Sequence, residues 1–126
     1  MQEYLIEDAK TIAVFDDDQD LLDVFQFLLE ETGYKAVLFN NCDDIVSVVK
    51  KVNPALILMD NWIPLVGGEK AIGQLRNEED LQHIPIILVS ASNDIAEVAK
   101  RAGAEGVIAK PFDFEVILSM INKFLR

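Results

Sequence analysis

The sequence has few basic residues, a single cysteine and no long apolar run, and each scarcity excludes a class of protein. Its 11 Lys and Arg residues face 22 Asp and Glu residues, which gives a formal net charge of −11 at pH 7. Surfaces that bind nucleic acid or anionic membranes need clustered positive charge, so we expect neither partner. The single cysteine, Cys42, excludes an intrachain disulfide.

Signals for export or membrane insertion are also missing. The N-terminal stretch MQEYLIEDAK is acidic where a secretory signal is basic. No apolar run approaches the roughly 18 residues of a membrane span. We therefore expect a cytoplasmic protein. At 126 residues the chain has the size of one domain with its own core. We predict a single domain over residues 1–126, in which 1–10 are an N-terminal extension.

Five short apolar runs alternate with five amphipathic helix patterns. The runs predict strands at Thr11–Phe15, Ala36–Phe39, Ala55–Met59, Pro85–Val89 and Gly106–Ala109. Apolar residues recur at helical spacing from Leu21 to Leu29, Ile45 to Val52, Ala71 to Leu75, Ile95 to Ala102 and Phe114 to Leu125. Strands that are apolar throughout are typical of parallel sheets buried on both faces. The sequence therefore predicts a three-layer, doubly wound α/β fold with right-handed crossovers.

Polar side chains follow four of the predicted strands. They are Asp16, Asp17 and Asp18 after the first, Asp60 after the third, Ser90 after the fourth and Lys110 after the fifth. Ligands of such folds bind at the carboxyl edge of the sheet, where all of these positions meet. Clustered carboxylates raise one another's pKa values, and a hard cation such as Mg²⁺ relieves that repulsion. A carboxylate beside Mg²⁺ and a lysine is equipped to attack a phosphoryl group, to which Ser90 can donate a hydrogen bond.

These motifs, in this order, resemble those of a response regulator receiver domain from about Thr11 to Arg126. They are DD at Asp16-Asp17, D-x-x-x-P at Asp60–Pro64, S-A at Ser90-Ala91 and K-P-F at Lys110–Phe112. The resemblance implies a flavodoxin-like (βα)5 fold with strand order 2-1-3-4-5. It implies Asp60 as phosphoacceptor, Ser90 as switch hydroxyl and Lys110 as the lysine of the motif, with a cis bond to Pro111. It also implies that Mg²⁺ binds Asp16, Asp17, Asp60 and the backbone carbonyl of Trp62.

The resemblance further implies a role in two-component or phosphorelay signalling. The phosphoryl group would come from a phosphohistidine on a histidine kinase or histidine phosphotransfer protein. The domain is not a conventional enzyme but would catalyse its own phosphorylation and slow hydrolysis. Output would change the surface around the fourth helix, fifth strand and fifth helix. A downstream protein, or an effector segment outside this sequence, would read that change.

Three positions depart from the family pattern. Val107 stands where relatives usually carry a Tyr or Phe whose inward swing accompanies activation, which puts the switch in doubt. Trp62 lies two residues after Asp60, at a position that tunes dephosphorylation in the family. We expect its bulky indole to slow attack by water on the acyl phosphate. Ile63 replaces the usual Met, a swap of similar volume.

Several residues have a plainer interpretation. Asp18 and Asp20 fit the start of a helix better than a metal site. Ser92, Asn93 and Asp94 are better placed than Ser90 to cap the fourth helix. Gly68 matches a loop glycine of the family, and His83 is expected at the surface.

Three other functions compete with this interpretation, and the sequence argues against the second and third of them. A receiver-like binding module indifferent to phosphorylation is compatible with Val107. A Mg²⁺-dependent phosphatase of this kind typically has a second carboxylate two residues after its nucleophile, where this chain has Trp62. A flavin-binding protein of similar topology requires a Ser-, Thr- and Gly-rich phosphate-binding loop after the first strand, where this chain has DDDQD.

Overall fold

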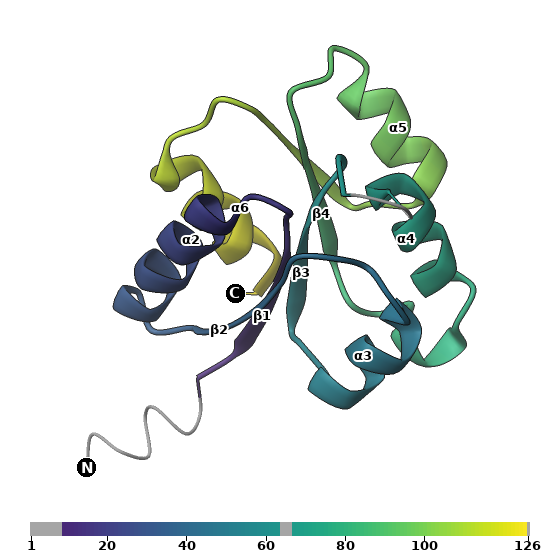
Figure 1. Cartoon of the computed structure of the whole chain (residues 1–126), viewed down its shortest axis with the longest axis horizontal. Coiled ribbons are helices and arrows are strands. Elements are labelled where there is room, and N and C mark those ends of the chain that lie inside the picture. Colours follow the sequence, from purple (N-terminus) through teal and green to yellow (C-terminus); the bar gives the residue numbers. More distant parts are fainter. Residues whose placement is uncertain (1–8, 64–66, 126) are drawn as a thin grey trace.

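A parallel sheet lies at the centre of the fold (Figure 1). The computed structural model describes residues 9–63 and 67–125. Within them the strands are β1 (Thr11–Phe15), β2 (Lys35–Phe39), β3 (Leu56–Asp60), β4 (Ile86–Ser90) and β5 (Gly106–Ala109). They form a five-stranded sheet in the order β2-β1-β3-β4-β5, and every adjacent pair is parallel. The predicted fold class and strand order are therefore confirmed.

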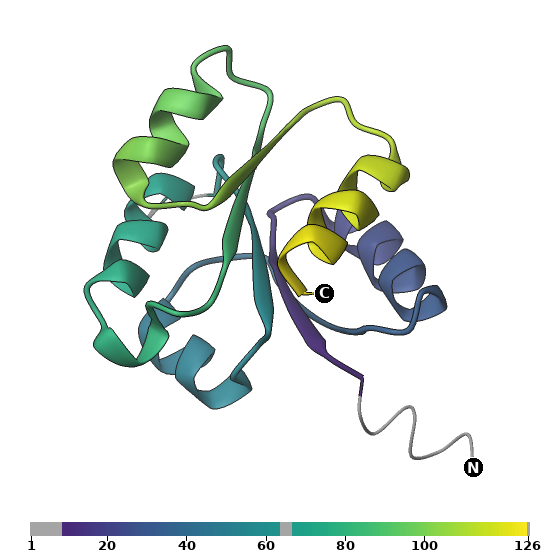
Figure 2. The ribbon, with the colours of Figure 1, turned by 180° about the vertical axis from the view of Figure 1, so that it is seen from behind.

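Helices cover both faces of the sheet. One face carries α2 (Gln19–Glu31) and α6 (Phe114–Leu125), and the other carries α3 (Ile45–Val52), α4 (Gly68–Arg76) and α5 (Ile95–Ala102), as Figures 1 and 2 show. A short 3-10 helix, η1 (Glu79–Leu81), precedes β4. No helix in the described ranges is both long and apolar enough to span a bilayer.

Alternating residues of each strand supply two hydrophobic cores. On β1, Ala13 and Phe15 join the core under α3, α4 and α5, whereas Ile12 and Val14 join the core under α2 and α6. This alternation follows from the two-residue period of a strand. It explains why the strand sequences are apolar throughout.

Helix ends agree with the sequence at some positions and not at others. Asp18 caps α2, because its Oδ1 accepts hydrogen bonds from the N–H groups of Asp20 and Leu21 at 3.0 and 3.3 Å. Asp44 and Asp94 precede α3 and α5, but among the described residues neither side chain makes a capping bond. Neither backbone is extended as a capping residue usually is: Asp44 is left-handed, with φ 53°, and Asp94 has φ −99° and ψ 23°.

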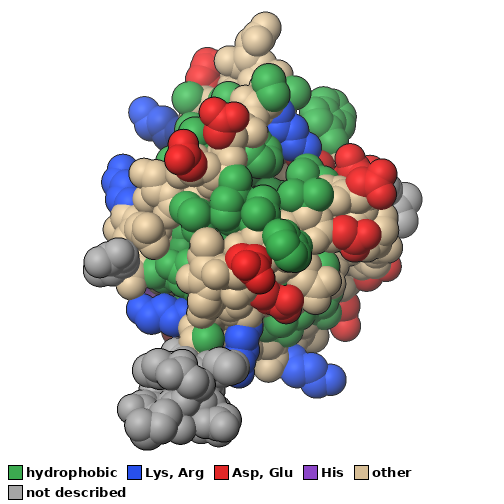
Figure 3. All heavy atoms as spheres, turned by 90° about the vertical axis from the view of Figure 1, so that its left-hand side faces the viewer, with side chains coloured by type: hydrophobic (Ala, Val, Ile, Leu, Met, Phe, Trp, Pro, Cys, Tyr) green, Lys and Arg blue, Asp and Glu red, His purple; other side chains and the backbone are tan. Residues whose placement is uncertain are grey.

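Acidic side chains are spread over the face formed by α2 and α6, with hydrophobic side chains between them (Figure 3). Val24 and Phe27 of α2 are 49% and 63% exposed, and Val116 of α6 is 45% exposed. The mixture fits the net charge of −11, and it opposes contact with anionic polymers by this face.

Arg76, at the end of α4, joins several segments at the amino edge of the sheet. Its Nε donates to the carbonyl of Gly103 at 2.9 Å, and its Nη1 donates to the carbonyl of Ile84 at 3.0 Å. Its Nη2 pairs with Glu105, whose Oε1 also accepts the N–H of Ile86 at 2.8 Å. One guanidinium therefore holds the start of β4 and the loop before β5 against α4.

We predict that Arg76→Met lowers the free energy of unfolding by about 2–4 kcal/mol, because partly buried carbonyls and Glu105 lose their donor. Urea denaturation followed by circular dichroism measures the change. Lys50→Met is the matched control, since it removes the exposed Lys50–Glu78 pair and should leave the midpoint almost unchanged. Equal midpoints for the two variants would contradict the role given to Arg76.

Candidate functional site

The carboxyl edge of the sheet brings together the polar residues singled out in the sequence. Asp16 directly follows β1, Asp60 and Ser90 are the last residues of β3 and β4, and Lys110 directly follows β5. Lys110 Nζ lies 3.2 Å from Asp60 Oδ1 and 3.8 Å from Asp16 Oδ2. Residues from four strands thus form one site. Asp60 has no basic residue beside it in the sequence, and Lys110, which follows β5, provides the positive charge instead.

Three carboxylates crowd this site. Each of Asp16, Asp17 and Asp60 offers an oxygen, and these oxygens lie within 4.8 Å of one another. Asp16 and Asp60 are only 2% and 3% exposed, whereas Asp17 is exposed. Asp18, which caps α2, and Asp20 do not belong to the cluster.

Burial dominates the electrostatics of the two inner carboxylates. It raises the pKa of Asp60, although Lys110 and the backbone amide of Trp62 act in the opposite direction. Burial likewise raises the pKa of Asp16; the N–H of Asp18, 2.9 Å from Asp16 Oδ1, opposes this, and the charge of Asp60 adds to it. Lys110 alone therefore does not compensate the negative charge of the cluster.

The donor set fits a hard divalent cation. Carboxylate oxygens at this spacing are ligands that Mg²⁺ accepts together with carbonyl oxygens and water. A cation there would favour the ionised forms that burial disfavours. The acidic site is thus compatible with Mg²⁺.

Ser90 and Lys110 flank Asp60 from β4 and β5. Ser90 is buried, and its Oγ accepts the N–H of Ser92 at 3.1 Å. This bond lies in the turn before α5, and the hydroxyl hydrogen is free to serve another acceptor. The peptide bond between Lys110 and Pro111 is cis, as the resemblance implied.

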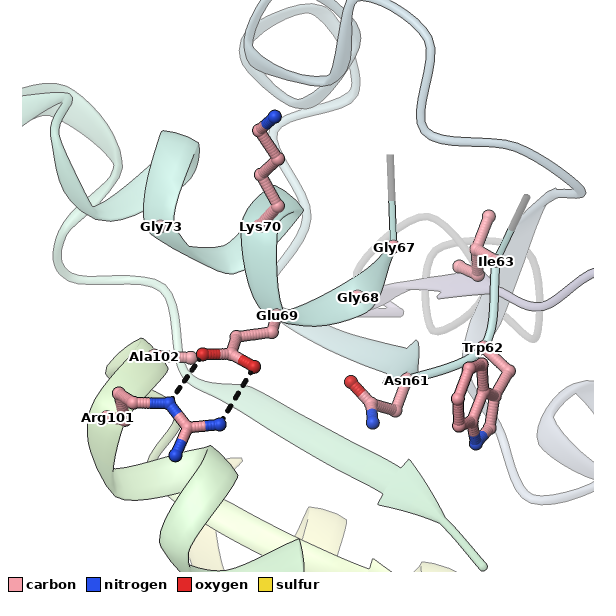
Figure 4. A pocket seen from close by; sticks show the side chains of 10 residues that line it. All are labelled: Asn61, Trp62, Ile63, Gly67, Gly68, Glu69, Lys70, Gly73, Arg101 and Ala102. Atoms are coloured by element: carbon pink, nitrogen blue, oxygen red, sulfur yellow. Dashed lines mark hydrogen bonds and ion pairs between the residues drawn. The ribbon is translucent and has the colours of Figure 1, made fainter. Parts of the chain in front are cut away.

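Trp62 and Val107 lie at two of the three positions where the sequence departs from the family pattern. The Trp62 side chain is 69% exposed and lies beside a hollow of about 690 Å³ next to α4 and α5 (Figure 4). Val107 is partly buried and packs against the core under α3, α4 and α5. His83 is exposed, as expected.

Gly68 has a closer role than the sequence revealed. A Cβ at this position would lie 2.3 Å from the carbonyl oxygen of Asp60 and 2.8 Å from Cα of Asn61. The Gly68 N–H donates to the carbonyl of Asn61 at 3.0 Å. The start of α4 is therefore seated directly on the backbone of Asp60 and Asn61. Its glycine identity and its match to a loop glycine of the family marked it in the sequence, but neither predicted this contact.

Comparisons with known proteins show the family of this chain. The family model described as "Response regulator receiver domain" matches residues 12–122. The polar-differentiation response regulator DivK of Brucella ovis is 28% identical over 119 residues, which cover 93% of this chain and 97% of the relative.

Solved structures resemble the fold closely. The signal receiver domain of a histidine kinase from Syntrophus aciditrophicus has a TM-score of 0.86 and 28% identity, covering 93% of this chain and 90% of that one. The receiver domain of the sensor histidine kinase PA1611 from Pseudomonas aeruginosa PAO1 has a TM-score of 0.83 and 24% identity, covering 92% and 97%. That structure has a magnesium ion coordinated in its active site cleft.

Proposed function

Because this chain belongs to the response regulator receiver domain family, we propose that Asp60 accepts a phosphoryl group from a phosphohistidine. The donor would be a histidine kinase or a histidine phosphotransfer protein. The observation that carries the proposal is the placement of Asp60, buried at the end of β3 with Lys110 Nζ 3.2 Å away and two further carboxylates beside it.

The transfer is a displacement at phosphorus. A carboxylate oxygen of Asp60 attacks the phosphorus atom, the P–N bond of phosphohistidine breaks, and the imidazole leaves. Lys110 neutralises charge on the phosphoryl oxygens, and the Ser90 hydroxyl donates to one of them. Mg²⁺, held by Asp16, Asp17, Asp60 and the carbonyl of Trp62, would neutralise the remaining charge. Attack by water on the same phosphorus regenerates Asp60 and releases inorganic phosphate.

Intact-protein mass spectrometry tests the proposal. Incubation with acetyl phosphate, a small phosphoryl donor, and Mg²⁺ should add the mass of one phosphoryl group, and chelation of the metal should prevent the addition. Borohydride reduction followed by peptide mapping should place the group on Asp60. Labelling elsewhere, or labelling that ignores Mg²⁺, would overturn it.

Phosphorylation is proposed to change the surface formed by α5, β5 and α6, which a downstream protein or an effector segment would then bind. Val107 supports a second candidate, a binding module that works without phosphorylation, because its small side chain offers no aromatic switch. Partner binding separates the two. The affinity of a receiver for its target changes when Asp60 is phosphorylated. The affinity of the module for its target is the same for phosphorylated wild type and for Asp60→Asn, which cannot be phosphorylated at this position.

We predict that Trp62→Ala shortens the half-life of the acyl phosphate several-fold, because loss of the indole opens the approach of water to Asp60. Loss of label after removal of the donor measures the half-life. Phe27→Ala is the control, since Phe27 is a similarly exposed aromatic residue on α2. An unchanged half-life in Trp62→Ala would refute a shielding role.

A further inference from the structure

A two-bond ion pair joins the first turn of α4 to the last turn of α5. Arg101 Nε donates to Glu69 Oε2 at 2.7 Å, and Arg101 Nη2 donates to Glu69 Oε1 at 3.1 Å (Figure 4). The side chains are 59% and 41% exposed, so the pair adds little to global stability. Its paired geometry is nevertheless demanding, because movement of either helix end by more than about 1 Å takes at least one bond beyond hydrogen-bond distance.

Glu69 is adjacent to the contact between α4 and the phosphoacceptor strand. The preceding residue, Gly68, rests on the carbonyl of Asp60 and bonds to the carbonyl of Asn61. Backbone displacement at Asp60 is therefore passed to the first turn of α4. From there it reaches the carboxylate that holds Arg101.

The space beside the pair leaves room for such a movement. The hollow of about 690 Å³ is bordered by small residues, Gly73 of α4 and Ala102 of α5. The ion pair lies along this hollow (Figure 4). At its other end, α5 follows the turn in which Ser90 accepts the N–H of Ser92. The candidate site is therefore connected to both ends of α5. The turn after Ser90 leads to its first turn, and α4 with the ion pair leads to its last turn.

We propose that the Glu69–Arg101 pair couples Asp60 to the last turn of α5. This inference rests on the proposed function and adds a route for its regulation. Phosphorylation alters α5 from two ends, through the turn after Ser90 and through α4 and the ion pair. The second route uses no side chain at position 107.

Hydrogen–deuterium exchange of the full chain tests this coupling, with Mg²⁺ present and with or without beryllofluoride as a phosphoryl mimic. Trp62 fluorescence on the same samples reports binding of the mimic. The variants are Glu69→Gln, which breaks the pair, and Arg101→Lys, which keeps the charge but not the paired geometry. Glu97→Gln is the matched control, because it removes an exposed acidic charge from α5 that also acts on Arg101, while both bonds of the pair stay in place.

In wild type, beryllofluoride should change exchange in the first turn of α4 and in the last turn of α5. Glu69→Gln should keep the α4 change and lose most of the α5 change, Arg101→Lys should be intermediate, and Glu97→Gln should match wild type. An undiminished α5 change in Glu69→Gln, or no α5 change in a wild type that binds the mimic, overturns the coupling alone. A wild type that does not bind beryllofluoride overturns the proposed function and the coupling together.

Discussion

Asp60→Asn is expected to slow phosphoryl acceptance by at least about 10³-fold, because an amide oxygen is a poor nucleophile and the variant keeps no other group at its position. Mass spectrometry after incubation with acetyl phosphate and Mg²⁺ measures the loss. We expect neither Asp16 nor Asp17 to replace Asp60, because both follow β1, whereas Asp60 ends β3 with Lys110 Nζ 3.2 Å away.

Loss of the fold would not explain this result. Burial raises the pKa of Asp60 above its value in the unfolded chain, so ionisation of Asp60 at neutral pH works against folding when no metal is bound. Asp60→Asn removes that charge, and the metal-free variant should unfold at the same or a higher urea concentration than wild type. Lower stability would contradict this expectation.

Asp18→Asn is the matched control for the loss of an acidic residue near the site. Asp18 caps α2, and asparagine caps a helix about as well as aspartate does. This variant should accept phosphoryl groups at close to the wild-type rate. If it fails as Asp60→Asn does, negative charge at this edge matters more than the identity of the nucleophile.

Gly68→Ala is expected to lower the free energy of unfolding by about 2–3 kcal/mol and to weaken beryllofluoride binding, because its Cβ collides with backbone atoms that have little freedom to move. The colliding atoms belong to Asp60 and Asn61, at 2.3 and 2.8 Å. Urea denaturation gives the first quantity, and titration followed by Trp62 fluorescence gives the second.

Gly73→Ala provides the matched comparison on the same helix. Outside the adjacent residues and the nearby backbone of α4, a Cβ at Gly73 would meet no atom within 4 Å, and alanine favours a helix interior by about 0.5–1 kcal/mol relative to glycine. Gly73→Ala should therefore stabilise the protein and leave the binding of the mimic unchanged. If Gly68→Ala and Gly73→Ala change unfolding and beryllofluoride binding to the same extent, the close contact of α4 with the backbone of Asp60 does not explain the need for glycine at position 68.

The sheet, and the meeting of the site residues at one of its edges, could be predicted because both depend on local sequence patterns. Uninterrupted apolar runs such as Thr11–Phe15 indicate strands buried on both faces, and parallel strands place their carboxyl ends at one edge. Asp60, Ser90 and Lys110 are each found next to such a run. Their meeting therefore follows from the topology without knowledge of any contact.

Contacts that depend on the docking of helices could not be predicted. Arg76 and Glu105, and likewise Glu69 and Arg101, are far apart in the sequence, and surface charges give no sign of their partners. Asp44 and Asp94 precede α3 and α5 but, among the described residues, do not cap them, because residue type favours a cap but does not set the backbone angles that aim its side chain. The contact of Gly68 with Asp60 depends on how α4 docks against β3.

Fluorescence of Trp62, the only tryptophan of the chain, tests the phosphoacceptor site most directly. Mg²⁺ is titrated first and beryllofluoride second, in wild type and in Asp60→Ala. We predict a saturable response of the wild type to Mg²⁺ and a second response to beryllofluoride that is absent from Asp60→Ala. A wild type that responds to Mg²⁺ but not to beryllofluoride would favour the phosphorylation-independent module. A beryllofluoride response that persists in Asp60→Ala would contradict Asp60 as the phosphoacceptor.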